Sequence, residues 1–137
     1  MGRWLIPTIG YVVVVGALGV TSKLALRSLT WQTAIVATAA VYVVATIVFA
    51  ALGQVRFGSG IDVFWAFASG VLAVGSLILL YVALGTGEAG KVVPISAAYP
   101  AVTLVLAAIF LSEALTLGRA AGALLVIGGV VVLTAVK

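Results

Sequence analysis

Long runs without a single charged residue constrain this chain more than any other feature. No charge occurs from Val92 to Leu111, and none occurs from Ala120 to Val136, where Thr134 is the only polar side chain. A helix that covers the first of these runs is about 30 Å long, which matches the hydrocarbon core of a bilayer. The intervening segment SEALTLGR is long enough only to turn the chain back. We therefore predict two transmembrane helices joined by a tight polar loop.

The composition of the whole chain extends this prediction to a multi-pass membrane protein. Hydrophobic residues make up 65% of the 137 residues and charged residues only 7%, whereas soluble domains carry about 25% charged residues. Apolar blocks indicate helices rather than a β-barrel, whose strands alternate in polarity. The expected fold is an all-α integral membrane protein, a single domain over residues 1–137. Its five transmembrane helices are expected at about residues 4–26, 31–52, 63–84, 92–111 and 117–136.

The first apolar block has an alternative interpretation as a signal peptide, because Arg3 precedes it. The block is long, Pro7 lies near its start, and four further apolar blocks follow. We therefore interpret it as a helix that remains in the protein.

The scarcity of reactive side chains argues against several classes of function. With 3 acidic residues, no Cys and no His, we expect no metal site, no cofactor and no enzyme. The 7 basic residues are scattered singly at helix ends, which is typical of topology signals and not of nucleic-acid binding. Asp62, Glu88 and Glu113 all fall at predicted helix ends. Glu113 precedes Thr116, the expected N-cap of the last helix, and is interpreted as structural.

Basic residues are divided almost evenly between the two sides of the predicted bundle. Five spans place on one side Arg3, Arg56 and Arg119, and on the other Lys23, Arg27, Lys91 and Lys137. Orientation follows the excess of Lys and Arg in short loops, and this division leaves almost no excess. We predict dual topology, in which copies insert in both orientations. The alternative is a chance balance in a chain with few charges.

Polar side chains form stripes on two of the predicted helices. Thr38, Tyr42 and Thr46 recur every four residues in the second helix, and Ser96, Tyr99 and Thr103 share one face of the fourth. Polar residues in membrane helices face the bundle interior or a cavity, although hydroxyl groups also bond to their own helix. We predict a neutral, aromatic cavity lining formed by Tyr11, Tyr42, Ser96, Tyr99 and Thr103.

Proline and glycine mark special points of the last two predicted helices. Pro100 removes a backbone hydrogen bond and is predicted to kink the fourth helix, either at a transport site or as a tolerated packing kink. Pro94 is expected near the helix start. Gly118 and Gly122 form a GxxxG pair on the fifth helix, and with Gly129 they predict close helix packing or a dimer interface.

The chain has a likeness to a known family that is strongest from Tyr81 onward. The residues that carry it are Tyr81, Ala83, Leu84, Ala89, Pro100, Glu113, Gly122, Gly128 and Gly129. In this order they make residues 81–133 resemble the C-terminal part of an EamA-type domain of the drug/metabolite transporter superfamily. The run GALLVIGGVVVL is also similar to the last helix of small multidrug resistance proteins, a shorter branch. Gly19, four residues before Lys23, is similar to the opening segment of the family.

The resemblance implies a transporter of small metabolites or drugs in the cytoplasmic membrane. Most members carry two such domains as an inverted repeat of ten helices, so this chain would supply one half and act as an antiparallel homodimer around a central cavity. The second helix lacks the Arg often found near its start. The first helix lacks the acidic residue on which small multidrug pumps depend, which argues against proton-coupled drug efflux. A non-transporting accessory or assembly subunit, or one half of a heterodimeric transporter, are the alternatives.

Overall fold

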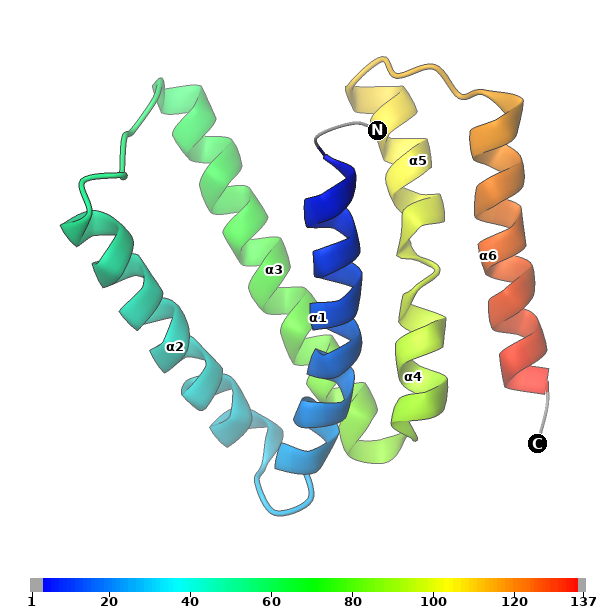
Figure 1. The fold of residues 1–137 in the computed structure, drawn as a ribbon, viewed down its shortest axis with the longest axis horizontal. Helices are drawn as coiled ribbons and strands as arrows, with labels where there is room; N and C mark the ends of the chain where they lie inside the picture. Colours follow the sequence, from blue (N-terminus) through cyan, green and yellow to red (C-terminus); the bar gives the residue numbers. More distant parts are fainter. Residues whose placement is uncertain (1–3, 136–137) are drawn as a thin grey trace. The chain divides into compact units, whose positions relative to one another are not determined.

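The computed structural model describes residues 4–135, and every regular element in this range is a helix. Five stretches of it are long and apolar enough to cross a membrane, as the sequence predicts. The chain divides into two compact units, Met1–Thr86 and Gly87–Lys137. Figure 1 shows the helices of each unit.

The N-terminal unit contains helices α1 (Leu5–Ala25), α2 (Trp31–Ala51) and α3 (Gly60–Thr86). Helix α3 packs against both α1 and α2. The buried side chains of Ser22, Ala34, Tyr81 and Leu84 lie where α1 ends, α2 begins and α3 ends, at the lower end of this unit in Figure 1. The core of the unit is therefore at one end of its helices, and elsewhere most of its large apolar side chains are exposed.

Helix α2 ends in a Schellman motif at a left-handed glycine. Gly53 has a φ of 65°, which an L side chain adopts only with strain. The Gln54 amide donates to the Phe49 carbonyl at 3.2 Å, and the Gly53 amide donates to the Ala50 carbonyl at 3.0 Å. These bonds satisfy carbonyl groups that would otherwise have no partner at the helix end.

Helix α3 begins at Gly60, three residues before the start expected from the sequence. The Asp62 carboxylate accepts hydrogen bonds from the Ser59 backbone amide at 3.1 Å and from the Ser59 hydroxyl at 2.5 Å. A carboxylate in the first turn also interacts favourably with the positive end of the helix dipole. Asp62 therefore stabilises the first turn, and the helix begins early.

The C-terminal unit contains α4 (Ala89–Ser96), α5 (Tyr99–Phe110) and α6 (Leu117–Ala135). Helix α6 packs against both α4 and α5. No residue from 87 to 135, the part of this unit that the structure describes, is buried. The unit is therefore a thin layer of helices without a core of its own.

The fourth span, Ala89–Phe110, contains a break of two turn residues, 97 and 98, just before the predicted kink at Pro100. Helix α4 ends at Ser96, and Pro100 lies in the first turn of α5. Pro100 has no N–H group, so the Ser96 carbonyl cannot receive the helical hydrogen bond from this position. The Ala97 amide is shared between the Val93 and Pro94 carbonyls, and the Ala98 amide donates to the Ile95 carbonyl three residues back, all at 3.1 Å.

The expectation that Pro94 lies near the start of its helix is wrong. Helix α4 begins at Ala89 rather than near Val92, so Pro94 lies inside the helix. The early start has a local cause, because the Lys91 and Val92 amides both donate to the Glu88 carbonyl, at 3.0 and 2.9 Å. The two prolines thus lie on either side of the break.

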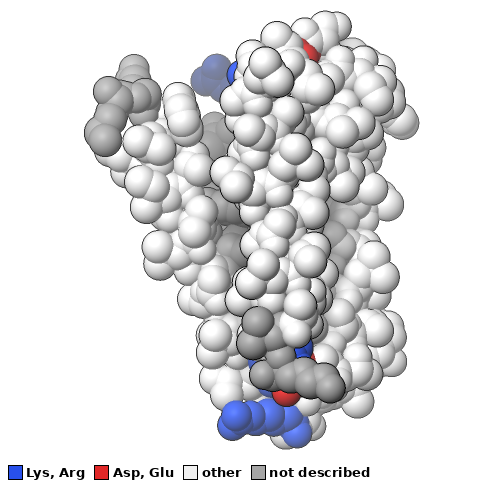
Figure 2. Space-filling view, turned by 90° about the vertical axis from the view of Figure 1, so that its right-hand side faces the viewer, with Lys and Arg blue, Asp and Glu red and all other residues white. Residues whose placement is uncertain are grey.

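Charged side chains lie at the ends of the helices, as a membrane-spanning protein requires. Figure 2 shows Lys, Arg, Asp and Glu only near the two ends of the visible face, and none in the apolar zone between them.

Candidate functional site

Three of the predicted lining residues lie together beside the break in the fourth span. Ser96 is the last residue of α4, Tyr99 is the first of α5, and Thr103 follows one turn later. The Tyr99 side chain is 53% exposed, and Ser96 and Thr103 are also exposed. The structure therefore places a tyrosine and two hydroxyl groups on an open face next to irregular backbone.

The other two predicted lining residues belong to the N-terminal unit. Tyr11 lies on α1 and is 54% exposed, and Tyr42 lies on α2 and is 67% exposed. Neither residue lines either of the two hollows described below. Their rings are uncovered in the single chain, so whatever contacts them is lipid or another surface.

Hydroxyl groups of the predicted stripes bond to their own helices. The Ser96 hydroxyl donates to the Val93 carbonyl at 2.7 Å, and the Thr103 hydroxyl donates to the Tyr99 carbonyl at 3.2 Å. Thr46 makes the same bond to the Tyr42 carbonyl at 2.9 Å. Each oxygen keeps acceptor capacity, so these side chains tolerate lipid and can still accept a bond from a solute.

Thr38 differs from the rest of its stripe because it also bonds to another helix. Its hydroxyl donates to the Ala34 carbonyl at 3.0 Å and lies 3.0 Å from the Tyr81 hydroxyl on α3. Tyr81 is only 4% exposed. The pair joins α2 to α3 within the buried end of the unit. The resemblance singled out Tyr81, but no polar spacing in the sequence pairs it with Thr38.

Lys23 joins α1 to the end of α3. Its Nζ donates to the Leu84 carbonyl at 2.6 Å, across 61 residues of sequence. Leu84 lies in the last turn of α3, where carbonyl groups lack helical partners and carry the negative end of the helix dipole. The cation therefore satisfies a carbonyl group that the helix itself leaves open.

A cavity of about 220 Å³ lies beside these contacts, within the N-terminal unit. Four hydroxyl side chains line it, those of Thr21, Ser22, Thr38 and Tyr81, and the remaining lining residues are Leu and Ala. Thr38 belongs to a predicted stripe, whereas Ser22 and Tyr81 belong to neither of the two predicted stripes.

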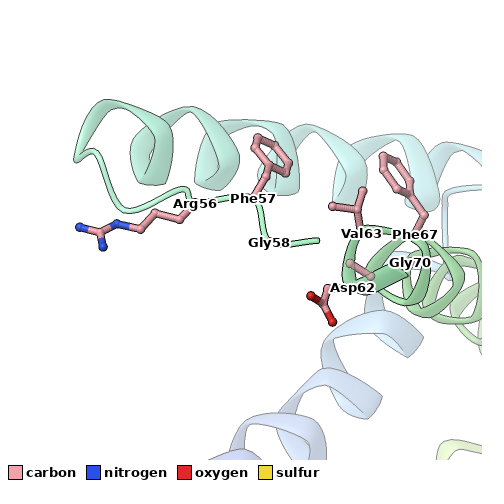
Figure 3. Close-up of a pocket in the computed structure, with 8 residues that line it drawn as sticks. Arg56, Phe57, Gly58, Asp62, Val63, Phe67 and Gly70 are labelled. Atoms are coloured by element: carbon pink, nitrogen blue, oxygen red, sulfur yellow. The ribbon is translucent and has the colours of Figure 1, made fainter. Parts of the chain in front are cut away.

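A larger hollow, about 470 Å³, lies at the α2–α3 connection. Figure 3 shows that Phe57, Val63 and Phe67 point to one side and the Asp62 carboxylate to the other, while the Arg56 side chain points away from the group. Phe57 is 82% exposed. Exposed apolar patches mark sites of contact with a membrane or another protein, so this hollow is better suited to contact with lipid than to holding a polar solute.

The glycines of α6 lie on the side that faces away from its own unit. The half-buried residues of α6 are Ala120, Ala123 and Val130. At about 100° per residue, the opposite side carries Gly118, Gly122 and Gly129. A Cβ atom at any of these glycines would meet no atom within 4 Å apart from its chain neighbours and the backbone of its own helix. Packing inside the single chain therefore does not require glycine at these positions.

The acidic residues of the C-terminal unit form local contacts. Glu113 pairs with Arg119 at 3.4 Å, and Glu88 pairs with Lys91 at 3.3 Å. Thr116 is the N-cap of α6, as expected, because its hydroxyl accepts from the Arg119 amide at 3.3 Å. Among the described residues, no three His, Cys, Asp or Glu side chains are grouped so as to hold a metal ion.

Comparison with known proteins places these features in a family. Residues 2–135 match the pattern described as the EamA-like transporter family. An uncharacterized protein of Methanocaldococcus jannaschii is 44% identical over 70 residues, which cover 51% of this chain and 51% of that relative. The match thus spans about half the length of this curated relative. No solved structure matches the chain.

Proposed function

The chain belongs to the EamA-like transporter family, and we propose that it is a subunit of a secondary transporter or facilitator for small metabolites or drugs. The observation that carries this proposal is the match of the family over residues 2–135. Transport is the activity of that family, in agreement with the expectation that the chain is not an enzyme. The expected membrane is the cytoplasmic membrane.

We further propose that two copies assemble in antiparallel orientation around a central cavity. The near-even division of Lys and Arg between the two sides favours insertion in both orientations. In this arrangement residues 1–137 form one domain, and the second copy supplies the other half of an inverted repeat. Transporters built from inverted repeats hold their substrate near the midplane, where the halves meet.

The exposure of the C-terminal unit supports a second copy. None of its described residues is buried, and its open face carries Tyr99 beside the break. Tyr11, Tyr42, Ser96, Tyr99 and Thr103 are the proposed lining of the cavity. Hydroxyl groups and aromatic rings at these positions suit a neutral or zwitterionic solute.

The proposed contact between copies is the glycine face of α6, formed by Gly118, Gly122 and Gly129. Small residues allow helix backbones to approach closely in lipid, where packing replaces the hydrophobic effect. Leu125 lies beside these glycines and near the middle of α6. In an antiparallel pair the two copies of Leu125 would lie close to the symmetry axis.

Orientation in the native membrane tests the assembly. The chain has no Cys, so Gln54→Cys in the α2–α3 connection and Ser28→Cys between α1 and α2 each provide a unique thiol. The thiols are labelled from outside the cell with an impermeant reagent. Dual topology predicts that each variant labels to about half of its total. Complete labelling of one variant and none of the other would disprove the antiparallel homodimer.

Transport by purified protein in liposomes tests the function itself. Uptake of a neutral or zwitterionic solute by this chain alone supports the transporter, and Tyr99→Ala is expected to reduce uptake without loss of assembly. No movement of any solute would favour the accessory subunit. Activity only with a second homologous chain would favour a heterodimer.

A further inference from the structure

The 220 Å³ cavity of the N-terminal unit has a buried floor and an open rim. Ser22, Ala34 and Tyr81 form the floor and are buried, whereas Thr21 and Leu29 at the rim are exposed. The lining comes from the last turns of α1, the first turns of α2 and the end of α3. A rise of about 1.5 Å per residue places this cavity within roughly 10 Å of the helix ends, nearer to one membrane face than to the midplane.

Ser22 has an unsatisfied hydroxyl at the floor of this cavity. The residue is 4% exposed, and its Oγ has no hydrogen-bond partner among residues 4–135. Its neighbour Thr21 bonds to the Ala17 and Leu18 carbonyls, both at 3.1 Å. A buried hydroxyl without a partner costs on the order of 1–3 kcal/mol. The position therefore favours any molecule that brings a hydrogen-bonding group to Ser22.

We propose that this cavity is a binding subsite for a small uncharged molecule that carries an amide, carbonyl or hydroxyl group on an aliphatic body. The amide or hydroxyl group would bond to Ser22 and to the free acceptor capacity of the Thr38 and Tyr81 hydroxyls. The Leu and Ala residues of the wall would contact the aliphatic part. The volume is smaller than that of sites for drug-sized ligands, about 300–1,000 Å³, so the bound group is small.

The charge distribution selects against ions. No ionisable acid or base lines the cavity apart from the Tyr81 phenol. The nearby cation, Lys23, is bound to the Leu84 carbonyl at 2.6 Å, so a negative helix end already offsets its charge. Transfer of an unpaired ion into such surroundings is far more costly than transfer of a hydrogen-bonded neutral group.

This subsite adds a binding step to the proposed transport function. Only the role of the subsite in transport rests on that proposed function. In the transporter, the cavity would hold the solute near one membrane face and select neutral molecules before they reach the central cavity. Binding itself requires only the N-terminal unit within the whole protein, so it can be measured separately from transport.

The test uses three probes with the same four-carbon chain: butyramide, butyrate and butylammonium. The full chain is placed in lipid nanodiscs, and saturation-transfer NMR measures binding of each probe to the unaltered protein and to Ser22→Ala. Butyramide is expected to bind saturably, and about five-fold more weakly to Ser22→Ala because one hydrogen bond is lost. Butyrate and butylammonium are expected to show no saturable signal. Val36→Ala, at a similar depth on the exposed face of α2, is the control that leaves butyramide binding unchanged.

Two results would overturn the subsite: saturable butyramide binding that is equal in Ser22→Ala, or equal binding of all three probes. Thiol chemistry gives a second measurement on a nearly isosteric variant. Ser22→Cys is expected to react with neutral methyl methanethiosulfonate at least ten-fold faster than with its charged sulfonatoethyl analogue, and butyramide should slow this reaction. Equal rates would contradict the neutral cavity.

Liposome uptake separates this subsite from the proposed transport function. Butyramide binding that depends on Ser22, without uptake of any solute, would leave the subsite intact and defeat the transporter. Uptake of neutral solutes together with butyramide binding that is equal in Ser22→Ala would leave the transporter intact and defeat the subsite.

Discussion

The two units of this protein achieve their structure in different ways. In the N-terminal unit, side chains far apart in sequence meet at a buried end, where Lys23 contacts the Leu84 carbonyl and Thr38 contacts Tyr81. In the C-terminal unit the ion pairs join residues close in sequence, Glu88 with Lys91 and Glu113 with Arg119. No described residue of the C-terminal unit is buried.

This difference indicates which part of the protein is defined before assembly. The N-terminal unit has long-range contacts that fix its three helices against one another. The C-terminal unit has a broken span and an exposed glycine face, so lipid and the proposed second copy contribute more to its arrangement. Equivalent substitutions are therefore expected to have larger effects on stability in the N-terminal unit.

The largest expected effect is that of Leu84→Ala, because Leu84 is fully buried. Loss of a buried leucine side chain is expected to lower the free energy of unfolding by about 2–5 kcal/mol. Unfolding in mixed micelles, followed by circular dichroism during a denaturant titration, measures the change. Leu106→Ala on α5, where the side chain is exposed, is the matched control and should have a much smaller effect. Equal losses would refute the contrast between the units.

Two lysine substitutions compare the stability contributed by a long-range contact, that of Lys23, with that of a local contact, that of Lys91. Lys23→Met leaves the Leu84 carbonyl without this partner, and we expect a loss of about 1.5–3 kcal/mol, typical of hydrogen bonds to charged groups. Lys91→Met removes an exposed pair with Glu88 and is expected to cost at most about 0.5 kcal/mol. The same unfolding assay ranks the two variants. A larger loss for Lys91→Met would reverse the comparison.

Substitutions at two helix ends, at Gly53 and at Ser112, are expected to change the free energy of unfolding in opposite directions. Both residues have positive φ, 65° and 54°, but only Gly53 does so without a steric penalty. Ser112→Gly is expected to stabilise the protein by about 1 kcal/mol, and Gly53→Ala to destabilise it by a similar amount. Thermal unfolding of both variants in one detergent checks the signs. Destabilisation by Ser112→Gly would show that the serine hydroxyl contributes more than the backbone strain costs.

Among the long-range contacts of the N-terminal unit, the smallest expected effect concerns the hydroxyl pair of α2 and α3. Tyr81→Phe removes the 3.0 Å contact with Thr38 and is expected to cost about 0.6 kcal/mol, an average value for such bonds in membrane proteins. Tyr42→Phe, on an exposed part of α2, should leave stability unchanged. Equal effects of the two variants would show that the Thr38–Tyr81 contact contributes nothing.

Features that depend on a few adjacent residues could be predicted from the sequence. The apolar runs specified the spans, because only a helix of sufficient length satisfies the backbone within a bilayer. Thr116 was expected as an N-cap because a hydroxyl before an apolar run satisfies local amides. A kink at Pro100 is also predicted, since proline has no N–H group. The start of the preceding helix is not predicted correctly, because Pro94 lies inside α4 and not near its beginning.

The residues of the small cavity show why a site is harder to predict than a span. Thr38 belonged to a recognisable stripe, and Tyr81 was noted only through the family resemblance. Ser22 is one hydroxyl among many on the helices, and nothing in its neighbours distinguishes it from Thr21. The Ser22 hydroxyl is buried without a partner because of where α2 and α3 lie. The pattern of residues along α1 does not predict those positions.

The sequence by itself determined the helical class, the number of spans, the positions of the charges and several helix ends. Each depends on hydrophobic runs or on hydrogen bonds between residues a few positions apart. Only the tertiary structure decided that Lys23 meets the end of α3, that Thr38 meets Tyr81, and that Ser22 lies at the floor of a cavity. These contacts join residues separated by tens of positions, and they arise because helices in lipid pack through the shapes of whole faces rather than through a pattern in one segment.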